Sequence, residues 1–235
     1  MTRFSRASAL GALFVLPMLM AVTTPAIAQV APQPGFAKLG GFAGVTVMPS
    51  NVSPSNVNDG MTAYQEIDGE ELFFLPRLDT RPLVRAILGY RARQASLEIS
   101  YERTQHDGTF FDVPLDATYQ AVNVDGRFFF ATAHRVQPHV LVGGSFPWLT
   151  VEDGSIDDAN LLEPEVGDAR FKGYGLNTEA GVTVFPTPQL GISVGYAYRV
   201  IWFDRASGVS DTLGELRPRF RETSGSIAIT GTFVF

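Results

Sequence analysis

Charged side chains recur at alternate positions within otherwise apolar stretches, and the chemistry they could perform is ion pairing inside a closed fold. In residues 95–102, apolar side chains alternate with polar ones that include Glu98 and Glu102. Buried charges must be paired, because removing one partner costs about 3–5 kcal/mol. We therefore predict an interior ion-pair network that consists of Arg85, Arg91, Glu98, Glu102, Asp125, Arg127, Glu179 and Arg199. Glu222 is a further candidate member.

The three histidines are the candidates for general acid–base chemistry. His106 falls in a predicted polar loop, and His134 and His139 fall beside a predicted short turn. None of them shares a recognisable short motif with a serine that it could activate as a nucleophile. We interpret all three as turn or rim residues, and we predict no catalytic residue and no enzyme.

One acidic stretch, residues 153–158 (DGSIDD), is a candidate for binding a metal ion. It lacks the remaining ligand positions and the terminal glutamate of an EF-hand loop. The chain has no cysteine, which excludes disulfides and thiolate metal sites. We interpret the stretch as a solvated loop and predict neither a metal nor a cofactor.

The elements that must position the charged residues are strands, because side chains of one kind recur with a period of two. We predict eight of them, each of about 9–15 residues, which suits a tilted strand that crosses a membrane. Long polar loops are predicted at 49–81, 105–116, 152–170 and 204–218, and short turns near Arg93, Ala133 and Pro186. The predicted strands span residues 36–48, 82–91, 95–103, 118–130, 138–150, 171–185, 190–203 and 220–235.

The first 28 residues have the pattern of a secretory signal peptide. Arg3 and Arg6 precede the apolar run 9–20, and a small-residue cleavage site ends at Ala26 and Ala28, directly before Gln29. We therefore predict two segments, a signal peptide at 1–28 and a barrel domain at 29–235. Cleavage would remove two arginines and change the net charge from −6 to about −8, which argues against binding to nucleic acid.

The last strand and the distribution of aromatic residues favour a membrane barrel. Ile227, Ile229, Phe233 and Phe235 share one face of the terminal stretch, as in a strand with one face in lipid. Aromatic residues fall near both ends of the strands, which predicts two interfacial girdles. The long-loop girdle would contain Tyr101, Tyr119, Trp148, Tyr174, Tyr198, Trp202 and Phe203, and the short-turn girdle Phe128, Phe130, Phe185, Phe233 and Phe235.

The stretches 136–144 (VQPHVLVGG) and 181–199 (GVTVFPTPQLGISVGYAYR), with the terminal Phe235, resemble the OmpA-like family of small outer-membrane β-barrels. The resemblance covers residues 36–235 and implies an all-β fold, an eight-stranded antiparallel up-and-down transmembrane barrel. It implies export to the bacterial outer membrane with both termini in the periplasm, and assembly through the C-terminal strand by the barrel-assembly machinery. The peptidoglycan-binding domain that follows the barrel in OmpA itself is not expected here.

The expected role is structural or surface interaction through acidic external loops, by a monomer surrounded by outer-membrane lipid and lipopolysaccharide. In an eight-stranded barrel side chains just fill the interior, so the charged network would form a closed core. The alternative is that the same network gates a narrow pore. Two further alternatives are an enzyme that modifies lipid A and a soluble, lipocalin-like binder, which would need an apolar interior.

Overall fold

The computed structural model describes residues 35–51, 71–73, 77–110, 113–157, 165–208 and 220–235. These residues form one antiparallel sheet and no helix long and apolar enough to cross a membrane. The signal peptide and its cleavage residues Ala26, Ala28 and Gln29 lie outside the described residues. The two-segment prediction therefore stays a prediction.

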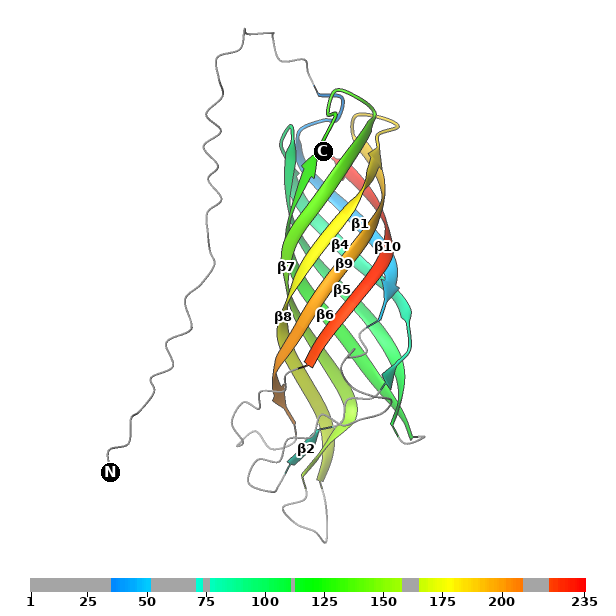
Figure 1. Ribbon diagram of the computed structural model, residues 1–235, viewed down its shortest axis with the longest axis vertical. Helices are drawn as coiled ribbons and strands as arrows, with labels where there is room; N and C mark the ends of the chain where they lie inside the picture. Colours follow the sequence, from blue (N-terminus) through cyan, green and yellow to red (C-terminus); the bar gives the residue numbers. More distant parts are fainter. Residues whose placement is uncertain (1–34, 52–70, 74–76, 111–112, 158–164, 209–219) are drawn as a thin grey trace, which may run out of the picture. The chain divides into compact units, whose positions relative to one another are not determined.

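Eight long strands close on themselves to form a barrel, as predicted (Figure 1). Around the ring the order is β1, β4, β5, β6, β7, β8, β9 and β10, and each strand is antiparallel to its neighbours. Two short strands, β2 (Glu71–Phe73) and β3 (Arg77–Leu78), pair with β7 and β5 outside the ring order. The eight ring strands are β1 (Gly40–Ser50), β4 (Arg81–Arg91), β5 (Ala95–Phe110), β6 (Val113–Phe129), β7 (Val136–Asp157), β8 (Glu165–Val184), β9 (Leu190–Ser207) and β10 (Phe220–Val234).

The barrel closes where the first and last long strands pair. The register runs from Phe42 opposite Val234 to Val47 opposite Ile229, and the backbone N–H of Phe235 donates to the carbonyl of Gly41 at 3.0 Å. This closure satisfies backbone groups that an open sheet edge would leave unpaired in lipid. A β-carbon on Gly41 would lie 2.6 Å from the Phe235 ring, so glycine provides the space that this ring occupies.

Side chains alternate between the two faces of the wall as the sequence pattern indicates. In β5, Leu97 and Ile99 are exposed on the outer face, whereas Ser96, Glu98 and Ser100 are buried inside. Each of the other long strands shows the same division over its central part. The exterior is therefore an apolar band and the interior is rich in polar groups, which is the arrangement of a membrane barrel.

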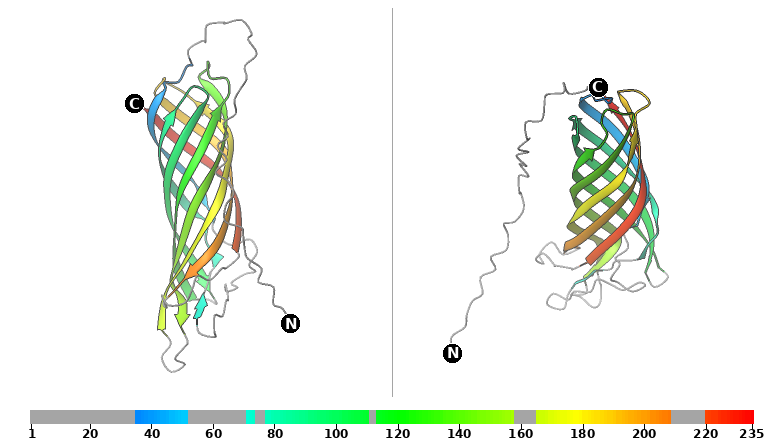
Figure 2. Two further views of the ribbon diagram at one scale, coloured as in Figure 1. Left: turned by 90° about the vertical axis from the view of Figure 1, so that its left-hand side faces the viewer. Right: turned by 45° about the horizontal axis from the view of Figure 1, so that its top comes forward.

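The strands extend further at one end of the barrel than at the other (Figures 1 and 2). Short turns at 92–94, 130–135 and 185–189 join strands at the end where Phe235 lies. At the opposite end β7 continues nine residues beyond Trp148, roughly 30 Å along the strand. Five of the eight ring strands, β5 to β9, are longer than the predicted limit of about 15 residues, and β7 has 22.

Much of the predicted loop sequence is therefore strand. Residues 105–110 belong to β5 and 113–116 to β6, and they pair from Gln105 opposite Thr118 to Phe110 opposite Val113. The predicted loop 152–170 likewise lies largely in β7 and β8. The reason is that an outer face in water needs no apolar residues, so alternation disappears from the sequence while backbone pairing continues.

Candidate functional site

The candidate site is the barrel interior, where Glu102 of β5 is the acceptor of one cluster of charges. Arg199 of β9 donates to both carboxylate oxygens of Glu102, at 2.7 and 3.0 Å. Nε of Arg85 donates to Oε2 at 2.8 Å, and the Tyr119 hydroxyl donates to Oε1 at 3.1 Å. Glu102 is completely buried, so three strands besides its own hold a single carboxylate.

A second cluster surrounds Arg127 of β6, nearer to the short turns. Its guanidinium donates to Glu98 at 2.9 Å and to Glu179 at 3.1 Å. Nε2 of His139 lies 2.9 Å from both Arg127 Nη1 and Glu179 Oε1, and its Nδ1 lies 3.1 Å from the Thr183 hydroxyl. The cluster therefore joins four consecutive strands of the ring, β5, β6, β7 and β8.

Between the two clusters lies Asp125, which accepts a hydrogen bond from the Asn177 amide at 3.2 Å and has Arg85 at 3.8 Å. The same amide donates to Asn123 at 3.1 Å. The opposing residue of β7 is Gly143, where a β-carbon would meet Asp125 Oδ1 and lie 2.5 Å from the Val124 carbonyl oxygen. Glycine is thus required for Asp125 to face inward at this position.

The short-turn end of the lumen is filled by Arg91 and two aromatic rings. The Arg91 guanidinium carbon lies 3.7 Å from the centre of the Phe129 ring and 4.7 Å from that of Phe185. Its Nη2 donates to Gln137 at 2.6 Å. A guanidinium over aromatic faces is favourable, especially where water is excluded. Arg91 is therefore buried, and among the hydrogen bonds of the described residues it has no carboxylate partner. This differs from the prediction that Arg91 belongs to an ion-pair network.

The opposite end of the lumen is filled by apolar side chains that the sequence analysis did not assign to the interior. Leu83, Leu149, Val151, Phe171, Ile201 and Phe203 are buried there in one cluster with Tyr119. Tyr119 and Phe203 were predicted for one aromatic girdle and Phe185 for the other, and all three point inward instead. The polar lumen thus has an apolar layer beyond it, because the extension outside the predicted membrane needs a core of its own.

Two small cavities border these clusters, and each has a volume of about 20 Å³. That volume is room for roughly one water molecule. The first is lined by Arg85, Tyr119, Arg199 and Glu222, and the second by Arg91, Glu98 and Arg127. Glu222 is buried, and its Oε2 has no hydrogen-bond partner within the described part of the chain.

All eight predicted network residues are buried inside the barrel or nearly so, and seven of them form ion pairs there. Arg91 is the exception described above. Tyr119, Gln137 and His139 are further members of the network that were not predicted from the sequence. Their signal was the strand period, since each occupies an inward position of its strand.

The histidines differ from their prediction in two of three cases. His134 lies exposed in a turn, as predicted, whereas His139 is in the lumen. His106 is buried in β5 rather than in a loop, with Nδ1 2.7 Å from the Asp79 carbonyl and Nε2 3.5 Å from the Ser50 hydroxyl. Because a carbonyl only accepts, Nδ1 carries the proton and Nε2 faces Ser50 as an acceptor.

Within the described ranges, no three His, Asp or Glu side chains are grouped so that they could hold a metal ion. The acidic stretch that begins at Asp153 continues β7 as far as Asp157, and Asp158 lies outside the described residues.

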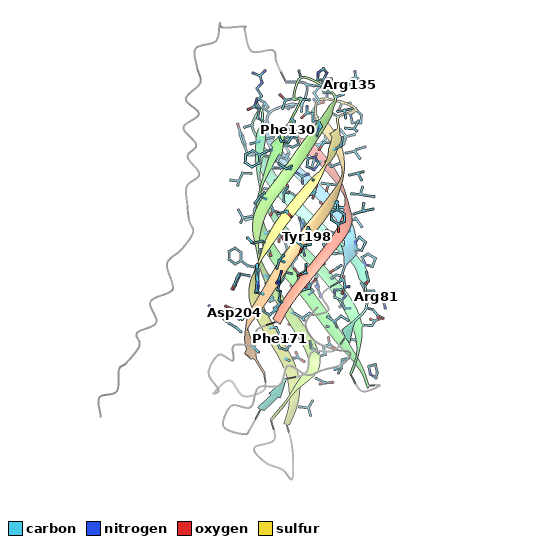
Figure 3. The ribbon with its side chains drawn as sticks, viewed as in Figure 1. Arg81, Phe130, Arg135, Phe171, Tyr198 and Asp204 are labelled. Atoms are coloured by element: carbon cyan, nitrogen blue, oxygen red, sulfur yellow. The ribbon has the colours of Figure 1, made fainter. Side chains whose placement is uncertain are left out.

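At the C-terminal end of the chain, Ile227, Ile229, Phe233 and Phe235 all lie on the exposed outer face. Figure 3 labels Phe130 and Arg135 near the short-turn end, and Arg81, Phe171 and Asp204 toward the extended end.

The comparisons with known proteins agree with this architecture. The family described as outer membrane protein beta-barrel domain matches residues 14–215. The chain therefore belongs to this family of outer-membrane β-barrels. No curated protein matches the sequence.

Two solved structures share the fold at low sequence identity. The crystal structure of Neisserial surface protein A (NspA) has a TM-score of 0.52 at 15% identity, and the match covers 83% of this chain and 97% of that one. The crystal structure of the outer membrane protein OprG from Pseudomonas aeruginosa has a TM-score of 0.50 at 15% identity, covering 85% and 98% of the two chains. The predicted fold class and the predicted family resemblance are thereby confirmed.

Proposed function

We propose that this protein is a non-conducting, non-catalytic barrel of the outer membrane that acts through structure and surface interaction. The observation that carries the proposal is the pair of hydrogen bonds from Arg199 to Glu102, which joins opposite walls of the barrel. The Arg127 cluster and Arg91 with its two aromatic rings lie on one side of this pair, and the apolar layer lies on the other. The two cavities that border these clusters each have room for about one water molecule.

The proposed orientation places the short turns in the periplasm and the long extension outside the cell. Outer-membrane barrels have short periplasmic turns and longer external loops. The chain provides a direct test, because its only lysines, Lys38 and Lys172, are both exposed and lie at opposite ends. A membrane-impermeant amine reagent should label Lys38 only after the outer membrane is permeabilised, and labelling of Lys38 in intact cells would contradict the orientation.

Surface interaction is the role that the extension favours. Loops on a rigid scaffold commonly carry binding residues. Residues 152–170 contain seven acidic residues and one arginine, so this end has a local negative charge. A monomer whose acidic loops meet divalent cations at the lipopolysaccharide surface is consistent with that charge.

A gated pore is the second candidate, and one observation favours it. Glu222 has a carboxylate oxygen without a partner beside the cavity that Arg85 and Arg199 line. Such a group could accept the Arg199 guanidinium if Glu102 released it, which would open the lumen. Catalysis is disfavoured, since the Ser50–His106 pair faces the interior and its 3.5 Å separation is long for a hydrogen bond.

Release of a small dye from vesicles separates the two candidates. The protein purified from outer membranes should release no dye, whereas an Arg85→Ala, Glu102→Ala, Arg199→Ala variant should release it and serve as a positive control. Release by the unmodified protein that Glu222→Gln abolishes would favour the gated pore and contradict the closed interior.

A further inference from the structure

The outer wall has a hollow of about 390 Å³ at the level where the apolar band meets the extension. It lies on β7, β8 and β9, and Asp204, which lines it, is labelled toward the extended end in Figure 3. The rest of its lining includes three aromatic side chains and two cations. The lining residues that matter here are Phe146, Trp148, Lys172, Tyr174, Asp204 and Arg205.

The register places the two cations side by side. Lys172 of β8 is directly opposite Arg205 of β9, and on its other side it is opposite Trp148 of β7. Like charges that face each other across a strand pair are destabilising. Asp204 is the acidic residue among those that line the hollow.

A bulge at this position turns Arg205 outward. The pairing of β8 with β9 shifts between Lys172 and Gly173, so that Asp204 is the additional residue of β9. Beyond it the alternation is reversed, with Arg205 exposed and Ala206 buried. Without the bulge Arg205 would point into the apolar layer around Phe203. Bulges are known to redirect single side chains in this way.

The aromatic rings fix the depth of the hollow in the membrane. The Tyr174 and Trp202 rings are stacked with their centres 5.5 Å apart, and Tyr101 lies 6.4 Å from Trp148. Tyrosine and tryptophan concentrate at the membrane–water interface. Lys172 and Arg205 lie directly beyond these rings, at the depth of lipid headgroups, and Phe146 extends toward the acyl chains with 60% of its surface exposed.

We propose that this hollow binds the phosphate group of a phosphorylated glycolipid of the outer leaflet, the lipid A part of lipopolysaccharide. Lys172 and Arg205 contact the phosphate, and Trp148, Tyr174 and Phe146 contact the sugar and the first part of an acyl chain. Two adjacent cations can hold a phosphate by charge-assisted hydrogen bonds. The inference rests on the proposed orientation, which places this end of the barrel in the outer leaflet.

The test is binding of diphosphorylated lipid A in detergent micelles to the protein purified from outer membranes, measured by native mass spectrometry. Unmodified protein should bind it at least about tenfold more tightly than lipid A without phosphates. The Lys172→Gln, Arg205→Gln variant should lose this difference. Arg135→Gln, which removes an exposed arginine at the opposite end, is the matched control and should keep it.

Three outcomes would overturn the proposal: equal binding by the double variant, no effect of phosphate removal, or displacement of the lipid by inorganic phosphate at equal concentration. If the double variant fails to fold, Lys172→Gln alone should show a partial loss, and unchanged binding would again contradict the site. Binding in micelles is independent of orientation. Labelling of Lys38 in intact cells would therefore refute the orientation without affecting the micelle result.

Discussion

Arg199 donates from both of its terminal nitrogens to both carboxylate oxygens of Glu102, at 2.7 and 3.0 Å. Their strands, β9 and β5, are four places apart in a ring of eight, so the two residues come from opposite walls. Two parallel hydrogen bonds between a guanidinium and a carboxylate fix geometry as well as charge. The pair therefore acts as a strut across the lumen.

Removing Glu102 should destabilise the barrel strongly. Glu102→Ala leaves Arg85 and Arg199 without the acceptor that both use, and we expect a loss of about 3–5 kcal/mol in the free energy of unfolding. Urea unfolding in lipid vesicles measures this loss. Asp107→Ala, which removes the exposed partner of Arg81, is the control and should cost no more than about 1 kcal/mol. Equal effects of the two variants would contradict a structural role for the strut.

A methyl group at Gly143 should be poorly tolerated. A β-carbon there would lie 2.5 Å from the Val124 carbonyl oxygen and against Asp125, whereas one at Gly231 would meet nothing within 4 Å. We expect Gly143→Ala to cost about 1–3 kcal/mol in unfolding free energy and Gly231→Ala to be close to neutral. Similar stability of the two variants would show that the lumen has room at Asp125.

His106 should make stability depend on pH. It lies five residues beyond Tyr101 and is buried, and burial lowers its pKa from the ordinary value of 6.5. The unfolded chain then binds a proton that the folded chain resists, so stability is lost as pH falls below about 6.5. The free energy of unfolding, measured from about pH 8 to about pH 5, should depend less strongly on pH in the His106→Gln variant. Exposed His134→Gln is the control, and an unchanged pH dependence in His106→Gln would contradict the assignment.

The exposed terminal ring should matter for assembly more than for stability. Phe235→Ala keeps the backbone bond from residue 235 to Gly41 but removes a lipid-facing ring at the last position. We expect a severalfold lower amount of folded protein in outer membranes, with refolding of the purified protein little changed. Phe128→Ala, which removes another exposed ring near the same end, should assemble normally. Equal assembly of the two variants would refute a terminal signal.

The barrel and its two faces could be predicted from the sequence because a strand in lipid must have apolar residues at alternate positions. Leu97 and Ile99 must be apolar, while Glu98 between them faces a lumen that can pair it. The alternation ends where the outer face leaves the lipid, and for this reason the sequence predicts a loop at 105–110, where the structure has a strand. The inward orientation of the Tyr119 and Phe203 side chains could not be predicted, since an aromatic residue suits both a membrane interface and an apolar core.

Partners within the lumen were predictable as a set and not as pairs. The period of two identifies which residues face inward, but the register that brings Arg199 to Glu102 depends on strand tilt across the whole ring. The cluster of Gln137 with Arg91 and the bulge at Asp204 have no sequence pattern of their own. Both arise from three-dimensional placement that alternation does not encode.

The closed interior is tested most directly by single-channel recording of the purified protein in a planar bilayer. We expect insertion without discrete openings at any applied voltage, because charged and apolar layers fill the lumen from Arg91 to Phe171. Stable, discrete openings of the unmodified protein would contradict it and would identify the Arg199–Glu102 strut as a gate.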